Sequence, residues 1–248
     1  MAFVISELGP PKGFHPISNT KVYLPNPLSS YNSCSLHLHY TLPPLVFVDT
    51  HELAQRDSSY SFRHWGSRDL ERPAHALPDE NSELLLDVRF LAEEVGHSKT
   101  AAGKGEGTTI DVEVPMHLRY GKPRAPASSE EGKTGPYEEV HVDWPKAFLK
   151  CSSPLYDHAS IPLPQRILLA LPSLNSEKDS VFTAIPPHVD FSSKTSSLLF
   201  LPVGNPKDLA IVEGVTVVTM LVCFIFLLRT SRRTAVRLTR NSTRPKTA

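Results

Sequence analysis

The sequence has few cysteines, no excess of either charge, and none of the short spacings that mark structural zinc sites. Of its 248 residues three are cysteine, and 26 lysines and arginines are matched by 26 aspartates and glutamates. A protein that binds nucleic acid mainly through phosphate contacts needs a basic excess, so a net charge of zero argues against that class. Because the chain has no Cys-x-x-Cys pair, a zinc finger or ribbon is not expected either.

The sequence also lacks the motifs of common catalytic sites. It contains no Gly-x-Ser-x-Gly, no His-Glu-x-x-His and no Asp-x-Asp pair, and Gly103-Lys104 has neither the preceding glycine nor the following hydroxyl residue of a phosphate loop. His37 and His39 share one face of a short alternating segment. A third metal ligand is missing, so a solvated polar face is the preferred interpretation. We therefore expect no catalytic residue, no cofactor, no metal and no small-molecule substrate.

Proline, by contrast, is abundant, and it disfavours long helices over most of the chain. There are 23 prolines, and 22 of them precede residue 207. Residues 110–120 alternate apolar and polar side chains, which predicts a half-buried strand that Pro115 interrupts or places at a sheet edge. Shorter alternations or apolar runs lie at 36–40, 45–48, 84–90, 140–144, 167–171 and 198–201. Many short strands between turns predict a mainly β fold, an antiparallel β-sandwich-like domain.

Two segments are too polar and too rich in glycine to bury much apolar surface. They are residues 97–109, which join two of the predicted strands, and residues 121–136, which follow the alternating strand at 110–120. A composition of this kind does not offset the entropy cost of ordering the chain. We expect both segments to be mobile loops of the β domain.

One stretch differs from everything before it. Residues 209–228 are apolar except for Glu213, which stands in the first turn and a half. An α-helix of twenty residues is about 30 Å long, which is the thickness of the hydrocarbon core of a bilayer. The run predicts a transmembrane helix, because a helix that is apolar on all sides otherwise needs a large protein around it. Glu213 would lie near the outer interface or contact a partner helix within the membrane.

The neutral average hides two opposite charge regimes. From residue 229 onward the chain has seven basic residues and no acid, which leaves 19 basic and 26 acidic residues in residues 1–228, a net charge of −7. The twenty residues before the apolar run hold only two lysines. Because basic residues concentrate on the cytosolic side of a membrane helix, the asymmetry predicts a lumenal domain over residues 1–208, a transmembrane helix over 209–228 and a cytosolic tail over 229–248.

Two features leave this topology open. The N-terminus has neither the basic start nor the apolar run of a signal peptide, so either the single helix drives translocation of the domain or the sequence lacks its true start. The helix also ends 20 residues from the C-terminus, which is the layout of tail-anchored proteins whose large domain stays in the cytosol. Asn241-Ser242-Thr243 is a glycosylation sequon that only a lumenal tail would use, so a glycan on Asn241 distinguishes the orientations.

The cysteines are compatible with a lumenal domain. Cys223 lies in the apolar run, which leaves Cys34 and Cys151 as the pair in the rest of the chain. In an oxidising compartment a disulfide between them would close a long loop, an effect of about 4–5 kcal/mol in the chain-entropy estimate. Two unpaired buried cysteines are the alternative, because pairing depends on geometry.

Several motifs together resemble the PIG-X family. They are Phe14-His15-Pro16; Cys34-Ser35-Leu36 followed by Leu42-Pro43-Pro44; Val46-Phe47-Val48-Asp49-Thr50-His51-Glu52-Leu53; Asp69-Leu70-Glu71-Arg72-Pro73; Val114-Pro115-Met116-His117-Leu118-Arg119-Tyr120; and Pro145 with Phe148 and Cys151. The resemblance covers about residues 14–230. Its most specific parts are the His-Leu-Arg-Tyr strand at 117–120 and the string of Leu-Pro, Val-Asp and Glu-Leu pairs over residues 42–53.

The resemblance implies a non-catalytic subunit of glycosylphosphatidylinositol (GPI) mannosyltransferase I in the endoplasmic reticulum membrane. In that family the partner is a multi-span PIG-M-type mannosyltransferase, which adds the first mannose to the glycolipid and which the family member stabilises. The expected partners are this enzyme and the membrane lipid. The residues expected at the contact surface belong to the matched motifs or to the polar face of the alternating strand: Asp49, Glu52, Asp111, His117, Arg119 and Tyr120.

Two other functional classes remain open. A tail-anchored adaptor that faces the cytosol would carry a glycan on Asn241, and residues 1–208 would not be protected from protease added outside the membrane. An unrecognised lumenal enzyme would need Asp49, His51 and a further acid in one cleft. Because no nucleophile stands near them in the sequence, a turn that ends a strand is the better account of residues 49–52.

Overall fold

The structure is a computed structural model that describes residues 1–67, 76, 79–89, 107–123, 137–152, 163–171, 181–191 and 195–242. Residues 97–106 and 124–136, which make up most of the two expected loops, lie outside this part of the chain, so the expectation that they are mobile stays a prediction. Thr108 and Thr109, the last residues of the first expected loop, belong to a strand instead.

Three antiparallel strands form the first sheet. They are β1 (Phe3–Gly9), β2 (Ile17–Leu24) and β7 (Thr108–Pro115), in the order β1-β2-β7. Every second residue of β2 is buried, including Val22 and Leu24, and so are Val112 and Val114 of β7. This period of two directs one face of the sheet into the core. β7 ends at Pro115, in agreement with the predicted interruption.

Five strands form the second sheet, in the order β11-β10-β3-β6-β5, again with antiparallel neighbours. Their bounds are β3 (Cys34–Leu42), β5 (Tyr60–Trp65), β6 (Ser82–Val88), β10 (Lys146–Cys151) and β11 (Val181–Ile185). The main core joins the buried faces of the two sheets, with Val22 and Val112 from the first sheet and Leu38, Leu84 and Leu86 from the second. The predicted mainly β, antiparallel fold is therefore confirmed.

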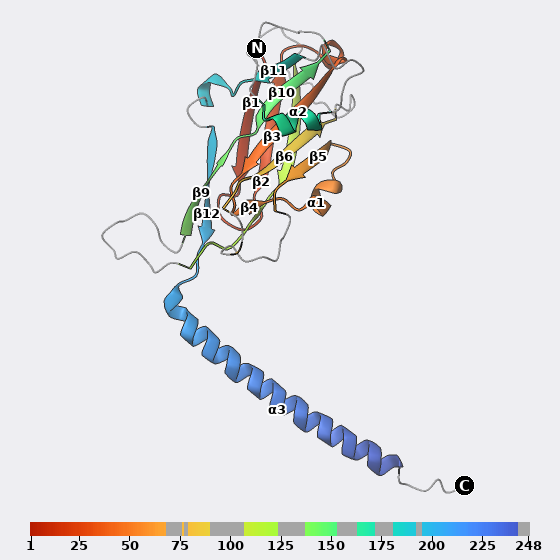
Figure 1. The fold of residues 1–248 in the computed structure, drawn as a ribbon, viewed down its shortest axis with the longest axis vertical. Coiled ribbons are helices and arrows are strands. Elements are labelled where there is room, and N and C mark those ends of the chain that lie inside the picture. The colour runs from red at the N-terminus through yellow and green to blue at the C-terminus, as the bar shows by residue number, and fades with distance from the viewer. Residues whose placement is uncertain are drawn as a thin grey trace, which may run out of the picture. The chain divides into compact units, whose positions relative to one another are not determined.

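The second sheet is covered on its outer face as well. The short helix α2 (Gln165–Ala170) buries Ile167 against Leu85 and Phe148, whose neighbours in sequence point into the main core. A strand buried on both faces carries consecutive apolar residues, which explains the unbroken Leu84-Leu85-Leu86 run. The apolar run at 167–171, which was expected among the strands, forms this helix. Figure 1 shows α2 lying over the strands of the second sheet.

Two short pairings complete the β domain. β12 (Ser196–Pro202) pairs with β9 (Tyr137–Asp143), and β4 (Val46–Phe47) pairs with β8 (His117–Leu118). The remaining elements are α1 (Thr50–Ala54) and the short 3-10 helices η1 (Leu28–Tyr31), η3 (Val189–Phe191) and η4 (Pro206–Asp208). The pairing of β4 with β8 brings together two of the motif segments that the sequence singled out.

The C-terminal helix is a separate unit. α3 (Leu209–Ser242) follows η4 and runs for 34 residues without a break, as the long blue ribbon of Figure 1. Residues Pro206–Thr239 form a helix that is long and apolar enough to cross a membrane, and none of its most apolar window is buried against protein. The helix continues beyond Leu228, where the apolar run ends.

A hydroxyl network inside the sandwich ties the two sheets together and yields a first prediction. The phenol oxygen of Tyr40 lies 3.0 Å from Thr20 Oγ1 and 3.3 Å from Ser18 Oγ, and Thr20 Oγ1 lies 2.9 Å from Ser6 Oγ. We expect Tyr40→Phe to lower the free energy of unfolding by about 1–2 kcal/mol, because it leaves buried hydroxyls short of a partner. Urea titration of the purified chain measures this.

The matched control for Tyr40→Phe is Tyr120→Phe, which removes the same atom from a side chain that is 70% exposed. A change of less than about 0.5 kcal/mol is expected there, as for most surface substitutions. If the two variants unfold at the same urea concentration, the buried network contributes nothing to stability.

Candidate functional site

Three motif segments that are far apart in the sequence meet at one place on the β domain. Besides the β4–β8 pairing, the N–H of Leu118 donates to the carbonyl of Phe14 at 2.9 Å, and the N–H of Arg119 donates to the carbonyl of Leu45 at 2.9 Å. Backbone hydrogen bonds thus fix the relative positions of the three segments. We call the side chains that they present the His117 surface: Phe14, His15, Phe47, Glu52, His117, Arg119 and Tyr120.

His117 is the centre of this surface. Its Nε2 lies 2.7 Å from Glu52 Oε2, and its Nδ1 lies 2.9 Å from Nδ1 of His15. A carboxylate only accepts hydrogen bonds, so Nε2 of His117 carries a proton, and in the neutral ring Nδ1 then accepts from Nδ1–H of His15. The imidazole also stacks on Phe47, with ring centroids 5.3 Å apart. The ring of His117 is therefore held in one orientation from three sides.

Aromatic rings and one guanidinium lie in the segments next to His117. The Arg119 guanidinium carbon lies 4.5 Å from the centroid of Phe47, and the residue is 7% exposed. The expectation that Arg119 lies on an exposed polar face is therefore wrong, because its side chain is buried against Phe47. Tyr120 is 70% exposed, and its ring contacts that of Phe14 at a centroid distance of 4.6 Å. A cation over an aromatic face is an attractive contact. The surface therefore combines an ordered polar centre with an exposed aromatic ring.

Asp49 has a structural part in this arrangement. Its Oδ1 accepts the N–H of His51 at 2.8 Å and so caps the N-terminus of α1, the helix that carries Glu52. Capping satisfies an N–H that lacks a partner within the helix. The expected turn after the strand is therefore the first turn of a helix. Asp49 bonds to the backbone of His51, and Glu52 reaches His117 instead of the His51 ring.

The structure places two further candidate residues elsewhere. Asp111 lies on the exposed face of β7, where its Oδ1 is 3.8 Å from Nζ of Lys21; both side chains are about two-thirds exposed, and such a pair contributes little to stability. It is six residues from His117, about 20 Å of extended chain. Glu213 lies in the second turn of α3 with its side chain exposed.

Sequence reasoning about single positions missed His15 and Phe47. Both lie inside the quoted motif strings, so a signal for them was present. What the sequence lacked was the pairing of β4 with β8, which places Phe47 against His117.

Cys34 and Cys151 are joined by a disulfide in the structure. The two residues are directly opposite each other in the pairing of β3 with β10, and they are 117 residues apart in sequence. Cys151 is fully buried. Cys223 is a free, exposed cysteine on α3. Of the two alternatives that the sequence left open for this pair, the structure contains the disulfide.

The expectation of a solvated face at His37 and His39 is wrong. Both residues lie on the outer face of the second sheet, on the side that α2 covers, and they are 0% and 3% exposed. Burial lowers the pKa of His37 to about 4, and burial also lowers the pKa of His39, against the opposing effect of Glu83. These rings are neutral at pH 7.

Carboxylates accompany both buried histidines. Nδ1 of His37 is 3.7 Å from Asp87 Oδ1, and Nε2 of His39 is 3.5 Å from Glu83 Oε2, while the other oxygen of Glu83 pairs with Arg166 of α2. No group of three or more histidine, cysteine, aspartate or glutamate side chains in the described part of the chain is placed to hold a metal ion.

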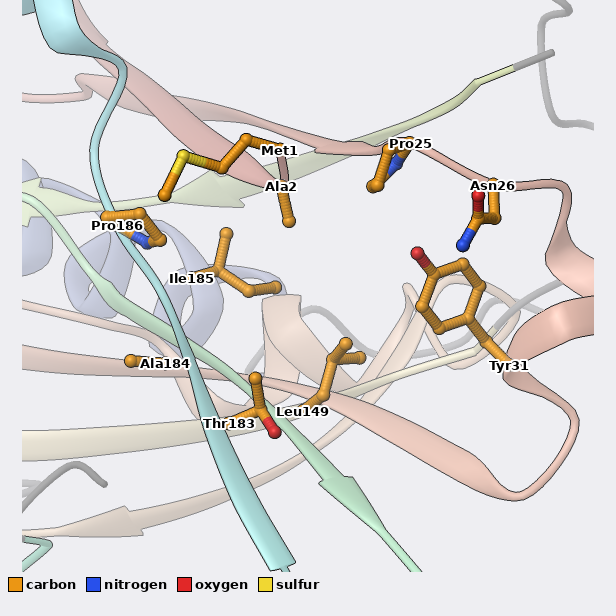
Figure 2. Close-up of a pocket in the computed structure, with 10 residues that line it drawn as sticks. All are labelled: Met1, Ala2, Pro25, Asn26, Tyr31, Leu149, Thr183, Ala184, Ile185 and Pro186. Carbon is orange, nitrogen blue, oxygen red and sulfur yellow. The ribbon is translucent and has the colours of Figure 1, made fainter. Parts of the chain in front are cut away.

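A pocket of about 300 Å³ lies on another part of the β domain. In Figure 2 the side chains of Leu149, Ile185 and Ala2 line its apolar part, and the Tyr31 hydroxyl lies near the Asn26 amide at one side. The described lining residues include no carboxylate and no imidazole, the side chains that most often act as general acids and bases. The pocket contains none of the candidate site residues.

Among the described residues, the partners of His117 differ from those of a catalytic histidine. A histidine oriented by a carboxylate becomes a catalytic base when its second nitrogen faces a hydroxyl or thiol nucleophile. Nδ1 of His117 faces the ring of His15 instead. Tyr120, which is 70% exposed, belongs to a residue type that is enriched among the side chains carrying most binding energy at protein interfaces.

Comparison with known proteins identifies the family that these segments belong to. Residues 11–231 match the model of the family described as PIG-X / PBN1. Protein pbn1 of Neurospora crassa is 25% identical over 224 residues, which are 88% of this chain and 40% of that protein. Protein pbn1 of Schizosaccharomyces pombe is 29% identical over 154 residues, 60% of this chain and 40% of that protein. Protein PBN1 of Yarrowia lipolytica is 28% identical over 158 residues, which are 57% of this chain and 27% of that protein. The matched regions thus span between 27% and 40% of these relatives.

Proposed function

The chain belongs to the PIG-X / PBN1 family, and from this premise we propose that it is a non-catalytic subunit of GPI mannosyltransferase I. In this role it stabilises the multi-span catalytic subunit in the endoplasmic reticulum membrane and so supports addition of the first mannose to the glycolipid. Family membership over residues 11–231 is the observation that carries the proposal. A β domain joined to one apolar helix suits a subunit that acts by contact.

The proposed topology is a single pass with the β domain in the lumen. The seven basic residues after the apolar run, with no acid among them, favour a cytosolic C-terminus. The Cys34–Cys151 disulfide supports a lumenal domain, because disulfides persist in oxidising compartments. A glycan on Asn241, or digestion of residues 1–208 by protease added to sealed microsomes, would contradict this orientation.

We propose the His117 surface as the contact with lumenal loops of the catalytic subunit. The side chains of His117 and Glu52 remain 21% and 39% exposed, and Tyr120 is exposed beside them. Because backbone hydrogen bonds already hold the three segments in place, little conformational entropy is lost when a partner binds. Within the membrane Glu213 is the proposed polar contact, since acids in transmembrane helices face partner helices or cavities.

The variant Tyr120→Ala tests this contact. We expect the amount of multi-span mannosyltransferase that co-purifies with the full-length chain in mild detergent to fall about tenfold, because truncating a tyrosine anchor at an interface typically costs more than 1 kcal/mol. The cellular level of the enzyme should fall with it. Quantitative immunoblotting of the co-purified and total enzyme measures both.

The matched control is Val189→Ala, which truncates another exposed side chain, 78% exposed, on η3. It should leave co-purification unchanged. If the Tyr120→Ala variant and the wild type capture equal amounts of the enzyme, the His117 surface is not part of the interface. Normal enzyme levels and normal lipid mannosylation in cells that lack this protein would contradict the subunit role itself.

A further inference from the structure

The arginines beyond the apolar part of α3 lie on one side of the helix. α3 continues through Ser242, and the segment after Gly214 contains no glycine or proline that would break it. Arg229, Arg232, Arg233 and Arg237 follow the apolar run at spacings of three, four and eight residues from the first. At about 100° per residue these spacings place all four within an arc of roughly 140°.

The threonines of this segment lie elsewhere around the helix, and of its apolar residues Val236 falls within the arc. The hydroxyls of Thr230, Thr234 and Thr239 donate to carbonyls of their own helix, on Phe226, Thr230 and Ala235, at 2.9, 3.0 and 2.9 Å. All three threonines fall outside the arc of the arginines. The sequence has no aspartate or glutamate after Glu213. The arginine face therefore has no acid within its own helix segment to neutralise it.

The depth of the arginines matches the layer of lipid headgroups. With a rise of about 1.5 Å per residue, Arg232 and Arg233 lie about 5–6 Å beyond Arg229, and Arg237 about 12 Å beyond it. The polar headgroup layer of each leaflet is about 5–7 Å thick, and arginine side chains extend several ångströms from the helix axis. Three of the four guanidinium groups can thus reach lipid phosphates, and a tilt of the helix towards the arginine face brings in the fourth.

We propose that this arginine face, Arg229, Arg232, Arg233 and Arg237, binds the phosphate groups of anionic phospholipids in the leaflet at which α3 leaves the membrane. Guanidinium groups bind phosphate oxygens through paired, charge-assisted hydrogen bonds. Basic residues close to an anionic leaflet each strengthen binding about fivefold. The tendency of basic residues to stay on the cytosolic side of a membrane helix depends only on their charge. Binding to lipid phosphates also explains why the arginines lie on one side of the helix. The proposal rests on the proposed membrane span and not on the partner enzyme.

The test uses the full-length chain, without any partner, in lipid nanodiscs made of phosphatidylcholine with 20% phosphatidylserine or phosphatidylinositol. Lipid that stays with the protein after detergent extraction is counted by mass spectrometry. We expect anionic lipid to be enriched on the wild type. The triple variant Arg232→Gln, Arg233→Gln and Arg237→Gln should reduce that enrichment at least tenfold.

A second variant separates the face from the net charge. Exchanging neighbours, by Arg233→Thr with Thr234→Arg and Arg237→Leu with Leu238→Arg, keeps the composition and moves two charges about 100° around the helix. We expect this variant to lose most of the enrichment. Enrichment equal to that of the wild type would overturn the proposal in favour of unspecific charge, as would the absence of enrichment on the wild type.

Two further outcomes also count against the proposal. A chain that does not co-elute with the nanodiscs would overturn it, because the arginine face would then not lie at a bilayer. If the wild type retains an acidic peptide in pure phosphatidylcholine discs, and retains it equally well in discs that contain 20% phosphatidylserine, the arginine face would be assigned to a protein partner. None of these outcomes bears on the mannosyltransferase contact, which co-purification tests separately.

Discussion

Loss of the Cys34–Cys151 disulfide is expected to lower the free energy of unfolding of the β domain by about 5 kcal/mol. The bond closes a loop with a sequence separation of 117 residues, and the chain-entropy estimate for a loop of that length gives this magnitude. Typical domains are stable by about 5–15 kcal/mol, so the loss would leave the domain marginal. The variant is Cys34→Ala with Cys151→Ala, and reduction of the wild type should have the same effect.

Tryptophan fluorescence during urea titration measures this effect in the full-length chain. Both tryptophans, Trp65 and Trp144, belong to the β domain, so the signal reports that unit and not α3. The matched control is Cys223→Ala, which removes the free cysteine of α3. It should unfold at the same midpoint as the wild type when both are oxidised, and at the same lower midpoint when both are reduced. A difference of less than about 1 kcal/mol between the oxidised and reduced wild type would show that the loop-closure argument fails for this chain.

The sandwich was predictable because its core depends on local alternation. In β7 the buried Ile110, Val112 and Val114 alternate with exposed residues, and a period of two needs no knowledge of distant contacts. The apolar run of α3 was readable for the same reason, since the length of a membrane helix is set by the bilayer. The alternation also predicted that the strand continues to residue 120, but β7 ends at Pro115. Met116 and Leu118 keep the predicted burial although the chain leaves β2 after Pro115 and pairs with β4. After β8 ends at Leu118 the alternation is lost, and Arg119 is buried while Tyr120 is exposed.

The covering of a sheet face was not predictable. Alternation says that His37 and His39 share a face of β3, but it does not say whether solvent or protein lies above that face. The structure places α2 there, a helix whose apolar run looked like one more strand in the sequence. Similarly, the motif segments of the His117 surface were each visible, but their meeting depends on the pairing of β4 with β8.

The two faces of the second sheet therefore have different physical roles. The inner face packs apolar side chains against the first sheet, and the Tyr40 hydroxyl network fixes the two sheets to each other. The outer face buries imidazoles next to carboxylates under α2. Histidines that are neutral in the folded chain make stability depend on pH, because in acid the unfolded chain binds protons that the folded chain does not bind.

Acidification from pH 7 to pH 5 is expected to lower the free energy of unfolding by about 2 kcal/mol through His37 alone. Burial lowers the pKa of His37 from 6.5 to about 4, so the unfolded chain takes up a proton below pH 6.5 that the folded chain does not. Stability from this group is fully present above pH 6.5 and is lost as the pH falls towards 4. His39, whose pKa is lowered by the same cause, acts in the same direction.

One carboxylate opposes this effect at the acid end. Burial raises the pKa of Asp87 above its ordinary value, so the folded chain binds that proton more readily than the unfolded chain and gains stability as the pH falls. Carboxylates of ordinary pKa also begin to protonate below about pH 5. Urea titrations at pH 7, 6 and 5 therefore isolate the histidines best.

The variant His37→Gln assigns the effect to one group. Glutamine retains a polar side chain next to Ser35, whose Oγ lies 2.7 Å from His37 Nε2, but it does not titrate. We expect its stability to change by about 2 kcal/mol less than that of the wild type between pH 7 and pH 5. His141→Gln on the exposed face of β9 is the matched control and should follow the wild type. If the profiles of His37→Gln and the wild type run parallel, His37 is not the group whose burial makes the domain sensitive to acid.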